Sequence, residues 1–211
     1  PHQSRTIFLV AQSLENSSPR QVSQRISSQS TDVNSLAEKT IKSGGIIVYP
    51  TDTLYGFGGD ATNSVIINKI YNIKKRCGPI SVLVSNISMA FEISNLSEEE
   101  KIILSQNLGG ANTIIVPAKE RVLCPEIYGP NHSVGIRMPD HSFGKNLVQT
   151  LNYPITTTSV NHTGEPPLND PDDIMKQFGN KIDLMVDEGP LSSSQGSTIY
   201  KLIDKKLELI R

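Results

Sequence analysis

The chain has 211 residues and carries 20 Lys and Arg against 21 Asp and Glu, so its formal net charge is −1. A balance this close to zero excludes nucleic-acid binding through bulk positive charge, because neutralising a phosphate backbone requires an excess of clustered cations. With 36% hydrophobic and 19% charged residues, the composition is that of a water-soluble globular protein rather than a disordered or membrane protein. The length suits one large domain or two small ones.

The cysteines and the apolar runs indicate a cellular compartment. Cys77 and Cys124 lie far apart in the sequence and cannot form a disulfide framework, which is typical of a reducing environment. No run approaches the roughly 20 apolar residues of a membrane span, and the apolar stretch within residues 1–10 is too short for a signal peptide. We therefore expect a cytoplasmic protein with no membrane partner.

The first 31 residues are predicted to be an N-terminal strand, in the apolar run 6–11, followed by a polar connection. Residues 13–31 contain seven Ser and three Gln and show no apolar periodicity. We interpret this stretch as a loose connection or a weak helix, either part of the domain or appended to it. The main domain is then predicted to span residues 32–211.

From Asp32 onward, helical and strand patterns alternate. The predicted helices begin at capping signals and end at glycines, at Asn152 or in a basic cluster. They cover residues 32–44, 63–76, 97–110, 141–152 and 170–179, and the predicted strands cover 45–49, 80–84, 113–116, 155–159, 182–186, 197–203 and 207–211. This alternation predicts one α/β domain. Because strands also adjoin without helices near both ends, we expect a twisted mixed sheet flanked by helices.

The first polar segment at a strand end is residues 50–59, and open α/β sheets bind ligands at such ends. Thr51, Thr53 and Tyr55 supply hydroxyls beside several glycines, which would let a small polar ligand approach the backbone. The alternative is a Gly-rich turn in which Asp52 caps the local backbone.

A basic cluster, residues 74–76, follows the second predicted helix. Cations at a helix C-terminus complement its dipole, which is worth about 0.3 to 1 kcal/mol. Lys74 and Arg76 could instead clamp a polyphosphate, Arg76 through a bidentate fork and Lys74 as a point charge. The chain has neither a Walker-type nor a dinucleotide-binding glycine motif, so a polyphosphate site here would belong to another fold.

Two further segments carry polar groups in apolar surroundings. Arg137 lies within an apolar strand pattern, residues 133–139, and needs an anion, either an internal Asp or Glu or a ligand carboxylate or phosphate. Residues 156–167 are rich in hydroxyl and amide side chains, which could bind phosphate and sugar oxygens or form a local turn-rich loop. The histidines show no metal-ligand spacing, and no protein metal site is predicted.

Together these segments resemble the YrdC/Sua5 family, the threonylcarbamoyl-AMP synthases, with the YciO proteins as near neighbours. The resemblance covers about residues 32–211. It rests on five motifs in the family's order: PTDTLYG at 50–56, KKR at 74–76, VGIRMPDH at 134–141, SVNHTGEP at 159–166 and GSTI at 196–199. It implies a single YrdC-like α/β domain with a concave ligand site.

The resemblance also implies a reaction and its partners. A synthase of this family joins L-threonine, bicarbonate and ATP into L-threonylcarbamoyladenylate and pyrophosphate, for the t6A modification at position 37 of tRNA. Such an enzyme is a nucleotidyltransferase, and downstream tRNA threonylcarbamoyl-transfer proteins would use its product. Mg²⁺ would accompany ATP, held mainly by phosphates and water.

Carried over motif by motif, the resemblance assigns roles to individual residues. Lys74 and Arg76 would be catalytic, holding the triphosphate and stabilising the departing pyrophosphate. Arg137 would pair with the threonine carboxylate. The amino-acid pocket would further include Thr51, Tyr55, Thr157 and Ser197, and the ATP site would further include Ser133, Ser159, Asn161 and Arg211.

Two segments depart from the family pattern and leave alternatives open. The loop 76–80 is shorter than usual and lacks a second basic or amide residue, and residues 109–113 keep only one glycine and the threonine of the family's Pro-Gly-Pro-x-Thr. One alternative is therefore a YciO-like paralogue without synthase activity. The other is a YrdC-like module that binds tRNA or other RNA through Lys74, Lys75, Arg76 and Arg137.

Overall fold

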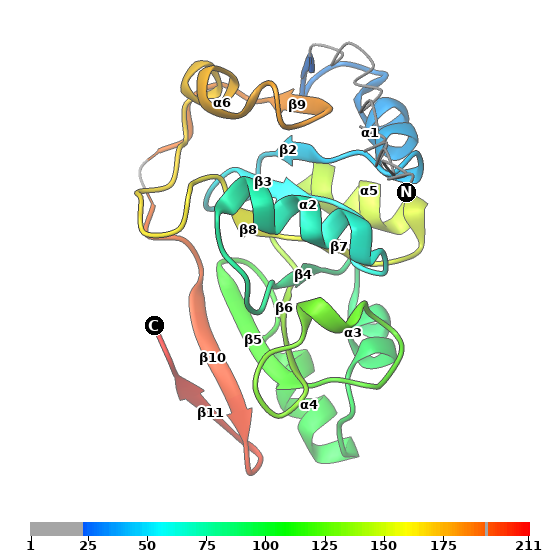
Figure 1. The fold of residues 1–211 in the computed structure, drawn as a ribbon. Coiled ribbons are helices and arrows are strands. Elements are labelled where there is room, and N and C mark those ends of the chain that lie inside the picture. Colours follow the sequence, from blue (N-terminus) through cyan, green and yellow to red (C-terminus); the bar gives the residue numbers. More distant parts are fainter. Residues whose placement is uncertain (1–22, 193) are drawn as a thin grey trace, which may run out of the picture.

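The strands form two mixed sheets in a computed structural model that describes residues 23–192 and 194–211 (Figure 1). The five-stranded sheet has the order β1 (Gln24–Ser27), β9 (Leu184–Asp187), β2 (Ile47–Tyr49), β3 (Gly56–Gly58), β8 (Thr158–Ser159). The six-stranded sheet has the order β11 (Lys206–Leu209), β10 (Thr198–Ile203), β5 (Asn112–Pro117), β6 (Ser133–Arg137), β4 (Val82–Leu83), β7 (Ile155–Thr156). The α/β class and the mixed strand directions are confirmed, but the strands are divided between two sheets instead of one.

The predicted strand 155–159 is where the chain passes from one sheet to the other. Its first half is β7 in the six-stranded sheet and its second half is β8 in the five-stranded sheet. Gly59, directly after β3, accepts a hydrogen bond from Thr156 N (2.8 Å) and donates one to Thr156 Oγ1 (3.0 Å). The two sheets are therefore joined at Thr156, and the ends of their strands meet around Thr157.

Six α-helices and one short 3₁₀ helix, η1 (Pro125–Ile127), surround the sheets in the described part of the chain. Figure 1 shows α2 in front of β3 and β8 and α5 behind them. The helices are α1 (Val33–Lys42), α2 (Ser64–Lys74), α3 (Ile87–Ile93), α4 (Glu98–Asn107), α5 (Ser142–Leu151) and α6 (Pro171–Phe178). None of these helices combines the length and the apolar character needed to cross a bilayer.

The predicted caps are largely confirmed. Asn63 Oδ1 accepts a hydrogen bond from Val65 N (3.0 Å), and Ser97 forms a capping box with Glu100 at the predicted start of α4. Asp170 Oδ1 accepts from Asp172 N (2.8 Å) at the start of α6. Asp32 occupies the N-cap position of α1, but its side chain makes no capping hydrogen bond to the first turn. Capping residues therefore located the helix starts correctly.

The interpretation of residues 13–31 as a loose connection or weak helix is wrong for residues 24–27, which form β1 at the edge of the five-stranded sheet. Its side chains are mostly exposed, so no apolar alternation marks it. Pairing with β9 holds it in place, together with an ion pair from Arg25 to Asp187 (2.8 Å). The apolar run 6–11 lies outside the described residues, and the boundary at residue 31 stays a prediction.

Besides η1, two other elements of the described chain were not predicted. β3 lies inside the Gly-rich segment 50–59, and glycines give no strand signal. α3 is only seven residues long and is capped by Asn86, whose Oδ1 accepts from Met89 N (2.9 Å). Helices this short carry too few turns for a clear apolar period.

A change at the cap of α6 tests the local contribution of that hydrogen bond. Asp170→Ala is expected to lower the free energy of unfolding by about 1 kcal/mol, because Asp172 N loses its acceptor. Urea denaturation measures this loss. The control is Asp173→Ala, which removes an exposed carboxylate from the first turn of the same helix without touching the cap. An equal loss in both variants would contradict a specific capping role.

Candidate active site

A cleft of about 260 Å³ opens where the two sheets meet. Its walls come from the β2–β3 loop, the segment after α2, the end of β6, the β7–β8 crossing and the start of β10. Most of the predicted site residues line it: Thr51, Tyr55, Arg76, Arg137, Thr157, Ser159, Ser197 and Arg211. Motifs that are far apart in the sequence therefore converge on one cavity.

Arg137, at the end of β6, is held by an internal carboxylate. It is 6% exposed, and its Nη2 lies 2.6 Å from Asp52 Oδ1 while its Nη1 donates to Thr53 Oγ1 (3.2 Å). Asp52 Oδ2 also accepts from Asp140 N (2.9 Å). Of the two anions that the sequence left open for Arg137, the structure thus shows the internal one. The alternative reading of Asp52 as a local cap is wrong, since its carboxylate binds residues about 85 positions away.

Arg137 nevertheless keeps a donor. Its Nε is buried and has no hydrogen-bond partner among the described residues. Thr113 on β5 pairs directly with Arg137 across the six-stranded sheet, and Thr113 Oγ1 lies 2.7 Å from Ser197 Oγ. A guanidinium and two hydroxyls therefore share one wall of the cleft.

The hydroxyls of the β2–β3 loop hold the cleft wall in shape. Thr51 Oγ1 donates to Leu54 O (2.7 Å) and accepts from the backbone N–H groups of Thr53 and Leu54 (both 3.2 Å). Tyr55 OH donates to Gly189 O (2.8 Å) and accepts from Glu188 N (2.9 Å). Burial raises the pKa of Tyr55 to about 12, so this phenol stays protonated near neutral pH. These bonds fix the loop against the segment that follows β9.

Arg76 is the cation of the basic cluster that faces the cleft. Lys75 ends α2 in a left-handed conformation (φ 56°), which redirects the chain so that Arg76 follows toward the cavity. The Nη2 of Arg76 donates to Pro79 O (2.7 Å), and its Nε is buried with no hydrogen-bond partner in the described part of the chain. No carboxylate among residues 23–192 and 194–211 forms an ion pair with it. Its charge is therefore available to an anion in the cleft.

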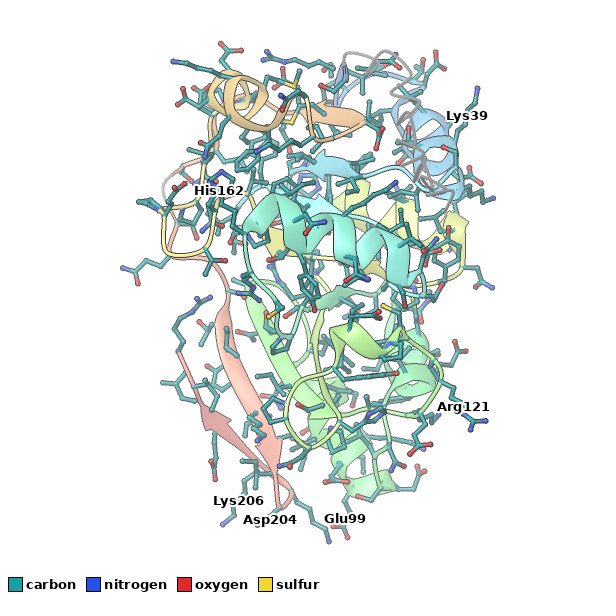
Figure 2. All side chains as sticks on the ribbon, in the orientation of Figure 1. Lys39, Glu99, Arg121, His162, Asp204 and Lys206 are labelled. Atoms are coloured by element: carbon teal, nitrogen blue, oxygen red, sulfur yellow. The ribbon has the colours of Figure 1, made fainter. Side chains whose placement is uncertain are left out.

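Lys74 and Asn161, two predicted site residues, do not line the cleft but lie behind its wall. Lys74 is 2% exposed, and its Nζ contacts Ser159 O, Asn161 O (3.2 Å) and Asn161 Oδ1 (3.1 Å). Burial lowers the pKa of Lys74 to about 8, and the charge of Arg76 contributes to this shift. Next to them, His162 Nδ1 lies 2.8 Å from Ile73 O, and Figure 2 shows His162 beside the end of α2.

Ser133 lies in a smaller neighbouring pocket of about 200 Å³ that shares Ser81, Thr113 and Ile199 with the cleft. Its Oγ donates to Pro130 O (2.8 Å). Sequence reasoning missed Ser81 and Gln195, which also line the cleft. Gly135 is a residue whose type reflects the position of Ser81, because a Cβ at Gly135 would lie 2.5 Å from Ser81 Oγ. That contact depends on strand pairing, which the sequence does not reveal.

Comparison with models of protein families identifies the family of this chain. Residues 39–211 match the model of the Sua5, YciO and YrdC proteins, which bears the description "Telomere recombination". The chain belongs to the Sua5/YciO/YrdC family. The resemblance inferred from the five motifs is therefore confirmed.

Individual members of the Sua5/YciO/YrdC family match most of the chain. A protein of Methanocaldococcus jannaschii named "putative threonylcarbamoyl-AMP synthase" is 34% identical over 177 residues, which is 82% of each chain. The crystal structure of P. abyssi Sua5 with L-threonine has a TM-score of 0.81 at 24% identity, over 90% of this chain and 57% of that one. E. coli YciO has a TM-score of 0.81 at 21% identity, over 90% of this chain and 95% of that one. These two structures share the fold, and the present chain spans little more than half of Sua5.

Proposed function

We propose that this protein is an L-threonylcarbamoyladenylate synthase, a nucleotidyltransferase that acts on L-threonine, bicarbonate and ATP. The observation that carries the proposal is the cleft between the sheets, where Arg76 has no acidic partner among the described residues and hydroxyl-bearing family motifs surround it. A cation facing a polar cavity suits a polyphosphate. The match to a relative named as such a synthase supports the same conclusion. The thiols Cys77 and Cys124 are free, which supports a reducing cytoplasmic setting.

The reaction requires no side-chain nucleophile. The threonine amine and bicarbonate combine into a carbamate with loss of water, and a carbamate oxygen then attacks the α-phosphorus of ATP. The bond from the α-phosphorus to the bridging oxygen breaks, and pyrophosphate leaves with the electron pair. Such a step depends on orientation and on stabilising charge at the leaving group.

Within this proposal, the residues at the cleft divide into two groups. Arg76 binds the β- and γ-phosphates and stabilises the departing pyrophosphate, and Arg211 with Ser159 faces the nucleotide. Arg137 offers its unpartnered Nε–H to the threonine carboxylate, while Asp52 fixes the other side of the guanidinium. Thr157 and the Thr113 and Ser197 hydroxyl pair are placed to contact the amino acid.

We propose that Mg²⁺ enters the cleft already bound to the phosphates of ATP. The cleft lining consists of hydroxyls, guanidinium groups, the Gln195 carboxamide, glycines and apolar side chains, with no carboxylate among the described residues that form it. Phosphate and water oxygens are the ligands Mg²⁺ prefers when a protein offers few of its own. In that position the ion would neutralise charge on the triphosphate.

The direct test is pyrophosphate release. The protein is expected to release pyrophosphate from ATP only when L-threonine and bicarbonate are both present, and mass spectrometry should identify threonylcarbamoyl-AMP as the product. L-Valine, which has a methyl group where threonine has its hydroxyl, serves as the matched control substrate. Release that is independent of threonine, or no release although ATP and threonine bind, would overturn the proposal.

The YciO-like alternative has one observation in its favour, since the chain covers 95% of E. coli YciO with a TM-score of 0.81. A paralogue without synthase activity would bind ligand in the cleft yet fail the pyrophosphate test. The RNA-binding alternative has less support. Of the four cations it invoked, Lys74 is buried and Arg137 is paired with Asp52, which leaves Lys75 and Arg76 to contact a phosphate backbone.

A further inference from the structure

The hydrogen-bonding capacity of Lys74 is fully used inside the protein. An ammonium group has three N–H donors and no acceptor. Around Lys74 Nζ lie three oxygens: Ser159 O, Asn161 O at 3.2 Å and Asn161 Oδ1 at 3.1 Å. The side chain is 2% exposed and does not line the cleft. No donor therefore remains for a phosphate oxygen unless one of these bonds breaks.

Among the described residues no carboxylate pairs with Lys74, but other groups partly offset the cost of burying its charge, a cost that lowers its pKa to about 8. Its backbone is the last residue of α2, where the partial negative charge of the helix dipole favours a cation. The ring of Phe57 lies 5.6 Å from Nζ, within the range of a cation–π contact. With these contacts and a pKa of about 8, Lys74 stays mainly protonated near neutral pH without an external anion.

Asn161 links Lys74 to the cleft wall through hydrogen bonds. Its Oδ1 accepts from both Lys74 Nζ and Ser159 Oγ (2.6 Å), and its Nδ2 donates to Glu165 O (2.7 Å). Ser159 lines the cleft, whereas Lys74 and Asn161 stand behind it. A single network thus connects the end of α2 to the segment that follows β8.

We propose that Lys74 is a positioning residue that holds Ser159 and Asn161 in place, and that Arg76 is the member of the Lys-x-Arg pair that contacts phosphate. This inference rests on the proposed synthase function. It gives the two residues of one motif different roles, because their side chains contact different groups. Lys74 holds the segment around Ser159 and Asn161, and Arg76 binds the phosphates of ATP.

A double-mutant cycle distinguishes positioning from phosphate binding. Lys74→Met and Asn161→Ala are each expected to lower kcat/KM for ATP about 100-fold, the scale of a misplaced catalytic group. The Lys74→Met, Asn161→Ala double variant should have about the same kcat/KM for ATP as the less active single variant, because both changes break the same network. Lys74→Met combined with Arg76→Ala should instead multiply the two losses. Lys75→Met is the matched control: it removes an adjacent, exposed lysine and should keep normal activity.

A spectroscopic readout tests the proposal even if the protein proves to have no synthase activity or Lys74→Met fails to fold. Three protein acceptors should protect the Lys74 ammonium from solvent exchange, so ¹H–¹⁵N spectra of the wild type should show a lysine Nζ signal. The signal should change in Asn161→Ala and stay unchanged when ATP is added. A scalar coupling from this nitrogen to ³¹P with ATP, or multiplicative losses in the Lys74 and Asn161 cycle, would overturn the proposal.

Discussion

Replacement of Asp52 by alanine is expected to lower the free energy of unfolding by about 3 to 5 kcal/mol. Asp52 is the only anion that contacts the guanidinium of Arg137 within the described residues, at 2.6 Å, and both side chains are largely buried. Without it, a buried charge would stay uncompensated and the backbone N–H of Asp140 would lose its acceptor. Urea denaturation followed by circular dichroism measures the loss.

Two variants separate the charge of Asp52 from its shape. Asp52→Asn keeps an oxygen acceptor for Asp140 N and should cost less than Asp52→Ala. Asp52→Leu combined with Arg137→Met removes both charges and should recover much of the lost stability, because paired apolar groups can replace a buried ion pair. A loss below about 1 kcal/mol in Asp52→Ala would contradict a structural role for the pair.

Arg76→Ala is expected to lower kcat/KM for ATP about 10³-fold, with little change in stability. An arginine that stabilises charge on a transferring phosphoryl group contributes on this scale. The stability should change little because Arg76 is only partly buried and its side chain makes one hydrogen bond within the described residues, to Pro79 O. Threonine-dependent pyrophosphate release over a range of ATP concentrations measures the loss, and thermal unfolding checks the fold.

The chemistry of Arg76 can be examined with a conservative change. Arg76→Lys keeps the charge but loses the planar fork that binds two phosphate oxygens, so its activity should fall between those of the wild type and Arg76→Ala. Lys75→Ala controls for a general loss of charge at the end of α2. If Arg76→Ala kept normal activity, the phosphate site would have to lie elsewhere in the cleft.

Local chemistry made much of the fold predictable. Asn63, Ser97 and Asp170 mark helix starts through bonds made within three residues, and such short-range bonds can be inferred from spacing. The division of residues 155–159 between two sheets could not be inferred this way. It depends on Thr156 meeting Gly59, 97 residues earlier, and no local pattern encodes that meeting.

The candidate site shows the same limit. The five motifs identified many of the residues that line the cleft. They did not indicate the hydrogen-bond or ion-pair partner of each side chain. Arg137 pairs with Asp52 from a motif 85 residues away, and Lys74 bonds to Asn161 across 87 residues. Residue type predicts what a group is able to bind, whereas tertiary packing decides what it does bind.

The joining of the two sheets at Thr156 has a thermodynamic consequence. Because the cleft takes residues from both sheets, neither sheet alone can form a complete binding site. A ligand in the cleft binds only when both sheets are folded and docked, so its binding energy adds to the stability of the docked state by mass action. Occupancy of the cleft therefore couples the unfolding of the two halves, and the substrates themselves act as a reversible cross-link between them.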